Sequence, residues 1–180
     1  MPKRLLLPIL ALLGACTADP AAEHLLGFGD PVRGAALNAP RLLGDTSQLA
    51  NNPRQAALAA VQLEVLAEAF TGDPRYSHEV SGGTLHAVRL GRSELRRAIG
   101  IAPDAPAQAV IAQLREAAAA LDGGRIARAE AALSGPMFPA GPQASLSRLG
   151  RLPFLPRVSE AAGAANAEIQ RLDGTVRNRS

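Results

Sequence analysis

Alanine and leucine dominate this chain, and their abundance restricts the fold more than any motif does. Residues 16–180 contain 35 Ala and 20 Leu but only 8 Val, 5 Ile and 5 Thr. Ala and Leu favour helices, whereas strands are built mainly from β-branched and aromatic residues. No stretch shows a convincing alternation of apolar and polar residues. The sequence therefore predicts an all-α fold, a small irregular bundle of about four to six helices.

Capping residues and apolar spacing predict where these helices lie. The first begins at Pro53, after the cap residue Asn52, and ends near Phe70. Its apolar residues cover most of its circumference, so we expect it to be the central buried helix. Further helices are expected at 84–99, weakened in its middle by Gly91, and at 106–121, 125–133, 143–149 and 156–172.

The first sixteen residues have the organisation of a secretion signal. Lys3 and Arg4 precede an apolar run from Leu5 to Leu13. Nine apolar residues cannot cross ~30 Å of hydrocarbon, which takes about 20 helical residues. The segment is therefore predicted to be a cleaved signal peptide, not a permanent membrane span.

The quartet Leu13-Gly14-Ala15-Cys16 resembles the lipobox of bacterial lipoprotein precursors. The resemblance covers residues 1–16 and implies cleavage between Ala15 and Cys16, a diacylglycerol on the Cys16 thiol and a further acyl chain, such as palmitate, on the new N-terminus. It also favours the outer membrane, facing the periplasm, because Thr17 and not Asp follows the cysteine. The alternative is an ordinary signal cut after Ala18, with Cys16 unmodified.

The chain accordingly divides into four parts. These are the signal peptide at 1–15, a lipidated N-terminus and partly ordered tether at 16–51, a helical domain at 52–174 and a frayed C-terminus at 175–180. Pro and Gly interrupt the tether repeatedly. Leu37, Leu42 and Leu43 are nevertheless too apolar for a solvated linker, so part of this stretch is expected to lie on the domain.

Charge and aromatic content argue against nucleic acid as a partner. Without the signal peptide the chain has 17 Arg, no Lys and 16 acidic residues, a net charge of +1. A nearly neutral chain lacks the general basic character of nucleic-acid binders. Five aromatic residues also leave few platforms on which bases stack.

No motif predicts catalysis, a metal site or a cofactor. Asp73, His78, Glu79 and His86 are close in sequence, but their spacing does not match helical metal ligands, which lie three or four residues apart. Nucleophile and phosphate-loop motifs are absent from the sequence. We therefore nominate no catalytic residue, no metal ligand and no cofactor.

Arg89, Arg92 and Arg96 form one candidate contact surface. Their spacing places them along one strip of a helix, with Arg97 beside it. Such a strip can meet anionic lipid headgroups next to the anchor. The alternatives are a solvated face, or pairing with acids such as Glu64.

A second candidate is the segment from Leu152 to Pro156. Proline on both sides favours an extended backbone that presents Leu152, Phe154 and Leu155 as a compact apolar element. This element would either bind a partner or close the bundle as a lid, and the exposure of Phe154 discriminates the two.

Together these observations favour a lipid-anchored periplasmic protein that binds or assembles with other envelope components. Its predicted partners are the membrane, through the lipid on Cys16, and an envelope protein. The alternatives are a carrier of a small apolar ligand between the helices and a hydrolase with an unrecognised site.

Overall fold

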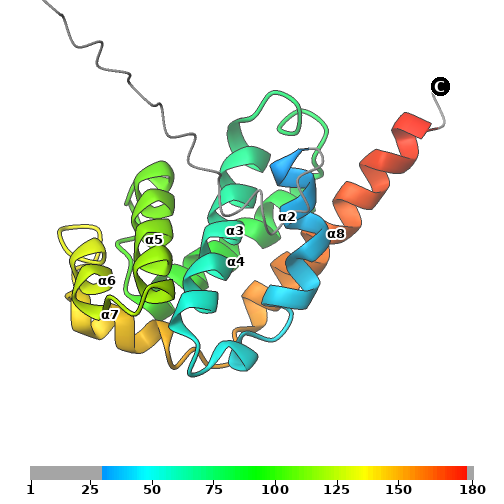
Figure 1. Cartoon of the computed structure of the whole chain (residues 1–180). Helices are drawn as coiled ribbons and strands as arrows, with labels where there is room; N and C mark the ends of the chain where they lie inside the picture. Colours follow the sequence, from blue (N-terminus) through cyan, green and yellow to red (C-terminus); the bar gives the residue numbers. More distant parts are fainter. Residues whose placement is uncertain (1–29, 178–180) are drawn as a thin grey trace, which may run out of the picture.

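The computed structural model describes residues 30–177, which form helices joined by turns and loops. The elements are α2 (Pro31–Leu43), the 3-10 turn η1 (Thr46–Leu49), α3 (Pro53–Gly72), α4 (Gly82–Ile99), α5 (Ala107–Asp122), α6 (Ile126–Ala132), α7 (Pro142–Leu149) and α8 (Pro156–Arg177). No strand occurs within residues 30–177, so the predicted all-α bundle is confirmed (Figure 1). Its seven α-helices exceed the expected four to six by one. The signal peptide, the lipobox and residues 178–180 lie outside the described residues.

The capping residues begin and end the helices where the sequence predicted. The Asn52 side chain accepts a hydrogen bond from the Gln55 N–H and caps α3, and Pro53 occupies its first turn. Gly100 ends α4 in the left-handed conformation, with φ of 89°. All the helices expected from the sequence are present close to their predicted ranges.

Helix α2 is the element that the sequence did not predict, and it lies in the expected tether. Asp30 caps it by accepting the Val32 N–H at 2.9 Å. Its buried residues are Val32, Ala35, Ala36, Ala39, Leu42 and Leu43. The bundle therefore includes residues 31–43, which were predicted to lie in the tether before a domain starting at residue 52.

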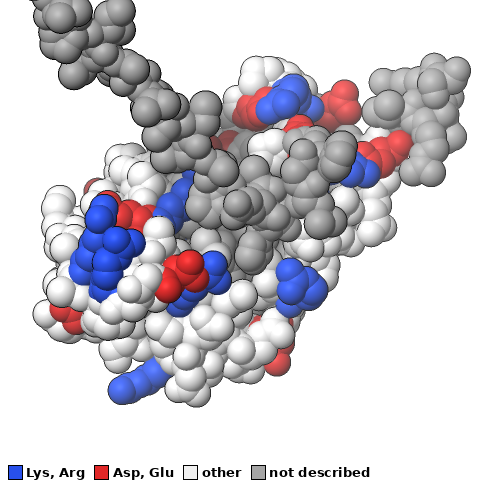
Figure 2. All heavy atoms as spheres, in the orientation of Figure 1, with Lys and Arg blue, Asp and Glu red and all other residues white. Residues whose placement is uncertain are grey.

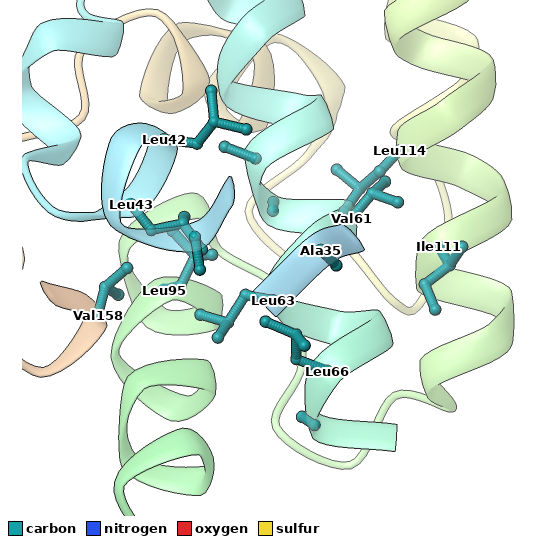
Figure 3. Packing of buried hydrophobic residues seen from close by; sticks show 14 of the residues in the cluster. Ala35, Leu42, Leu43, Val61, Leu63, Leu66, Leu95, Ile111, Leu114 and Val158 are labelled. Carbon is teal, nitrogen blue, oxygen red and sulfur yellow. The ribbon is translucent and has the colours of Figure 1, made fainter. Parts of the chain in front are cut away.

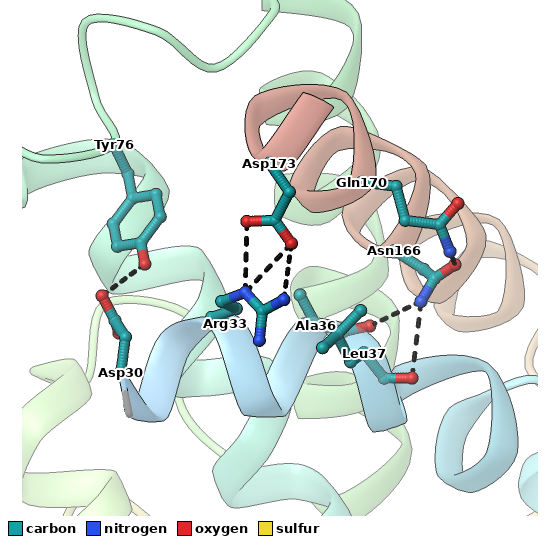
Figure 4. A network of polar contacts seen from close by, with 8 residues as sticks. All are labelled: Asp30, Arg33, Ala36, Leu37, Tyr76, Asn166, Gln170 and Asp173. Atoms are coloured by element: carbon teal, nitrogen blue, oxygen red, sulfur yellow. Dashed lines mark hydrogen bonds and ion pairs between the residues drawn. The ribbon is translucent and has the colours of Figure 1, made fainter. Parts of the chain in front are cut away.

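Pro40 explains why α2 is hard to see in the sequence. Proline has no N–H, so the Ala36 carbonyl four residues earlier loses its usual helical partner. The Asn166 amide of α8 donates to this carbonyl at 3.3 Å and to the Leu37 carbonyl at 3.4 Å (Figure 4). A tertiary contact thus replaces the missing local bond.

Helix α8 also extends further than predicted. It continues to Arg177, so residues 175–177 are helical where a frayed end was expected from residue 175. Arg33 of α2 holds Asp173 through both of its carboxylate oxygens, with the shortest distance at 2.7 Å (Figure 4). This ion pair stabilises the late turns of α8 against α2.

Helix α3 is the centre of the bundle, as predicted. It contacts α2, α4, α5 and α7, and most of its side chains are buried. In Figure 3, Leu63 of α3 lies close to Leu43 of α2 and Leu95 of α4, while Val61 and Leu114 meet between α3 and α5. Within residues 30–177 no helix combines the length and the apolar content needed to cross a membrane.

Gly91 allows α4 to lie directly on α8. A Cβ atom at this position would come within 2.6 Å of the Ala161 Cβ and 2.8 Å of the Arg157 carbonyl oxygen. Both distances are shorter than van der Waals contact, so a larger residue would force the helices apart. The glycine that was expected to weaken α4 is instead what permits its close packing.

Glu168 of α8 fixes the beginning of α4. Its carboxylate accepts hydrogen bonds from the Ser81 N–H at 2.8 Å, the Thr84 hydroxyl at 3.2 Å and the Arg171 guanidinium at 2.7 Å. Burial on its own raises the pKa of Glu168. The hydrogen bonds from Arg171, Ser81 and Thr84 favour the charged form and lower the pKa below its ordinary value of 4.5.

We predict that Gly91→Ala destabilises the protein by ~1–3 kcal/mol, because the added methyl group overpacks the α4 and α8 interface. Gly163→Ala is the matched control, since a Cβ at this exposed position of α8 meets no atom within 4 Å. The control is expected to gain ~0.5–1 kcal/mol, the usual advantage of Ala over Gly in a helix. Urea denaturation measures both changes, and equal effects of the two substitutions would contradict the packing argument.

We predict that Glu168→Gln lowers stability at pH 7 and that this loss disappears in acid. A carboxylate whose pKa is lowered by folding contributes its full stability above about 4.5, and loses it as the pH falls through the lowered pKa. The free energy of unfolding of both proteins should therefore be measured from pH 7 to pH 3. A difference that stays constant over this range would contradict the prediction.

Candidate functional site

A buried ion pair joins α3 to α4. Glu64 of α3 and Arg96 of α4 have side chains that are only 3% and 5% exposed. Arg96 donates to Glu64 through Nε at 2.6 Å and through Nη2 at 2.8 Å, a two-pronged geometry in which both carboxylate oxygens are used. The pairing with Glu64 that the sequence allowed is therefore present.

The third nitrogen of Arg96 holds the connection between α4 and α5. Its Nη1 donates to the Pro103 carbonyl at 3.0 Å and to the Ala105 carbonyl at 2.9 Å. Every nitrogen of Arg96 thus has an acceptor inside the protein. The prediction that Arg96 contacts lipid headgroups is wrong, because its guanidinium is buried and fully engaged.

Arg92 shares the same carboxylate but remains open to solvent. Its Nε lies 2.8 Å from Glu64 Oε2, and its side chain is 24% exposed. Two guanidinium groups consequently flank one carboxylate, so the cluster has a surplus of positive charge.

These residues form one wall of a pocket of about 460 Å³ between α4 and the following loop. Its lining consists of Arg89, Arg92, Ser93, Arg96, Arg97, Ile101 and Pro103. We call this the arginine pocket. Arg89 and Arg97 are exposed, and neither has a partner among residues 30–177.

The charge of the arginine pocket suits an anion. Four guanidinium groups line the pocket, and Arg92 and Arg96 share one carboxylate, that of Glu64. These five side chains carry a net charge of +3. The C-terminal end of a helix favours cations in its last turn, which accounts for Arg96 and Arg97. It does not account for Arg89, two turns earlier, so the helix dipole explains only part of the cluster.

The apolar segment 152–156 is mostly part of the core. Leu152 and Leu155 are 3% and 7% exposed, and Phe154 is 53% exposed. The buried Thr46 hydroxyl donates to the Pro153 carbonyl and accepts the Leu155 N–H at 3.0 Å, which holds the segment extended beside η1. Leu152 and Leu155 therefore belong to the core, as expected of a lid over the bundle, while Phe154 is exposed at the surface.

The polar residues considered for catalysis are not brought together. His78 and His86 are exposed, and Arg75 binds Asp73 at 2.7 Å. The pKa of Asp73 is lowered by the side-chain hydrogen bond from Arg75 and by the Arg75 N–H. In the described part of the chain, no three His, Cys, Asp or Glu residues are grouped as metal ligands.

Tyr76 connects the loop after α3 to the start of α2. Its hydroxyl donates to the Asp30 carboxylate (Figure 4). Its ring centroid lies 6.0 Å from that of Phe70. Burial raises the pKa of Tyr76, and the hydrogen bond to Asp30 raises it further. Tyr76 stays neutral at physiological pH and acts here as a structural hydrogen-bond donor.

Two further pockets also have polar walls. One of about 370 Å³ lies among α2, α3 and α5 and includes Glu68, Asp73 and Arg115. A smaller one of about 190 Å³ lies beside η1 and includes Arg41 and Gln48. Neither is the enclosed apolar cavity that a carrier of apolar ligands needs.

Comparison with known proteins identifies no relative of this chain. A scan against protein-family models and searches of curated proteins and solved structures found no match to this chain.

Figure 2 shows basic and acidic side chains interspersed on one face. The arginine pocket is thus a local concentration of charge in a chain of nearly balanced composition.

We predict that Glu64→Gln lowers the free energy of unfolding by ~3–5 kcal/mol, because it leaves the buried Arg96 without its counter-charge. Glu160→Gln is the control, since its pair with Arg157 is more than half exposed and should contribute at most about 1 kcal/mol. Urea denaturation at pH 7 measures both. A loss for Glu64→Gln no larger than that of the control would show that the buried pair is unimportant.

Proposed function

We propose that this protein is a lipid-anchored module of the bacterial cell envelope, facing the periplasm, that works by binding and not by catalysis. Its ligand site is the arginine pocket, and the ligand bears an acidic group. The observation that carries the proposal is the surplus of three positive charges around a pocket of 460 Å³. Arginine is well suited to such a site because its planar group binds carboxylates and phosphates through two hydrogen bonds.

The anchoring part of the proposal rests on the resemblance to lipoprotein precursors at Leu13-Gly14-Ala15-Cys16. Each buried methylene of an acyl chain contributes ~0.8 kcal/mol, and two or more chains hold a protein stably on a membrane. The packed domain begins by residue 30, so a short stretch separates Cys16 from α2. The acidic group would belong to a small molecule or to an envelope protein partner.

No observation within residues 30–177 favours a carrier of apolar ligands or a hydrolase, the two alternatives left open by the sequence. A carrier needs an enclosed apolar cavity, and the pockets described here have charged or polar walls. A buried His next to a carboxylate would indicate a hydrolase. His78 and His86 are exposed, whereas Glu64 and Glu168, both buried acids, bind arginines and local hydrogen-bond donors.

Anchoring is tested by the intact mass of the mature protein from membranes of a bacterial host that processes lipoproteins. We expect the N-terminus to begin at Cys16 and to bear diacylglycerol and a further acyl chain. Cys16→Ser is expected to abolish acylation and release the protein from the membrane fraction. A mature chain that begins at another residue without lipid would overturn this part of the proposal.

Ligand binding is tested by titrating sodium citrate, phosphate and sulfate into the ¹⁵N-labelled full chain carrying Cys16→Ser, which removes the acylation point. We expect saturable shifts of the Ser93 and Ile101 amides with at least one anion, and their loss in Arg89→Gln with Arg97→Gln. Arg151→Gln, an exposed arginine outside the pocket, should leave the shifts unchanged. Absence of saturable shifts with all three anions would overturn the anion site.

A further inference from the structure

The arginine pocket combines a high positive charge with an apolar wall, and this combination restricts the chemical class of ligand that fits it. We infer that it binds a phosphate monoester with a small organic body, an inference that rests on the proposed anion-binding function. The charge, the hydrogen-bond donors and the shape of the pocket each support this class of ligand.

The charge favours phosphate over singly charged anions. A carboxylate or a sulfate ester brings one negative charge, and the pocket has three positive charges in surplus. A phosphate monoester brings about −1.5 to −2 at pH 7 and three acceptor oxygens. It therefore balances more of the surplus with one group.

The donors around the pocket match the oxygens of a phosphate. Arg89 and Arg92 lie three residues apart on one strip of α4, and Arg97 lies on the adjoining strip. Each guanidinium can donate two parallel hydrogen bonds to phosphate oxygens, and the Ser93 hydroxyl adds another donor.

Part of this arrangement is fixed before a ligand arrives. Arg92 forms an ion pair with Glu64, with its Nε 2.8 Å from Oε2, and Arg96 fixes the opposite loop through the Pro103 carbonyl at 3.0 Å. Side chains that are already ordered lose less conformational entropy on binding, so a held Arg92 binds more tightly than a free one.

The apolar wall indicates that the phosphate is attached to a carbon framework. Ile101 and Pro103 line the side of the pocket that the loop provides. The volume of about 460 Å³ lies within the ~300–1,000 Å³ typical of sites for small organic molecules. A bare inorganic phosphate would leave this wall without a partner.

Two sources supply this chemistry, the phosphate monoester headgroup of phosphatidic acid and a soluble phosphate monoester. In both cases the phosphate meets the same arginines, and the carbon framework meets Ile101 and Pro103. The two differ in whether acyl chains add to the affinity.

The test is isothermal titration calorimetry on the full chain carrying Cys16→Ser, with phenyl phosphate and phenyl sulfate as probes. The two share an organic body and differ in the charge of the anionic group. We expect phenyl phosphate to bind at least about tenfold more tightly, a difference of about 1.4 kcal/mol. Arg89→Gln with Arg97→Gln should remove most of this advantage, and Arg151→Gln should leave it unchanged. Both arginines of the double variant are exposed, so its fold is expected to persist, as circular dichroism would verify.

Dihexanoyl phosphatidic acid, which is short enough to be soluble, distinguishes the sources. Tighter binding than phenyl phosphate supports a lipid headgroup, and equal or weaker binding supports a soluble ester. Equal binding of phenyl sulfate and phenyl phosphate would overturn the inference and leave the proposed anion site intact. Failure of both probes, together with citrate, phosphate and sulfate, would overturn the inference and the proposed function alike.

Discussion

The ion pair between Glu64 and Arg96 is the interaction on which the site depends. Removing two charges from water costs several kcal/mol each, so such a pair is retained only where geometry and further hydrogen bonds compensate. Arg96 meets that condition by giving two hydrogen bonds to Glu64 and others to the loop carbonyls of Pro103 and Ala105. It thereby fixes the relative positions of α3, α4 and the loop that leads to α5.

The four neighbouring arginines of this arrangement have different roles. Arg96 is structural, Arg92 is held by Glu64 but partly exposed, and Arg89 and Arg97 are free to meet a ligand. Arg96 is already removed from water and paired, so no further desolvation of its charge accompanies binding of an anion. The exposed arginines would gain an electrostatic partner. The geometry of the pocket therefore depends on Glu64, a buried acid that is not among the residues lining it.

Most of the fold could be predicted from the sequence because its signals are local. Asn52, Pro53 and Gly100 determine helix ends through their own backbone preferences, and these were recognised correctly. Helix α2 was missed because Pro40 is a local breaker whose unpaired carbonyl is satisfied by Asn166, a residue distant in the chain. The arginine strip was recognised by its spacing, but spacing does not reveal which arginine faces Glu64. Burial separates Arg96 from Arg89, and burial is a tertiary property.

The division of roles among the arginines is tested most directly by their reactivity toward phenylglyoxal, which modifies accessible guanidinium groups, followed residue by residue with mass spectrometry. We predict that Arg89 and Arg97 react as fast as the exposed Arg151, that Arg92 reacts more slowly, and that Arg96 is protected until the protein is unfolded. Modification of Arg96 in the native protein at the rate of Arg89 would contradict the account.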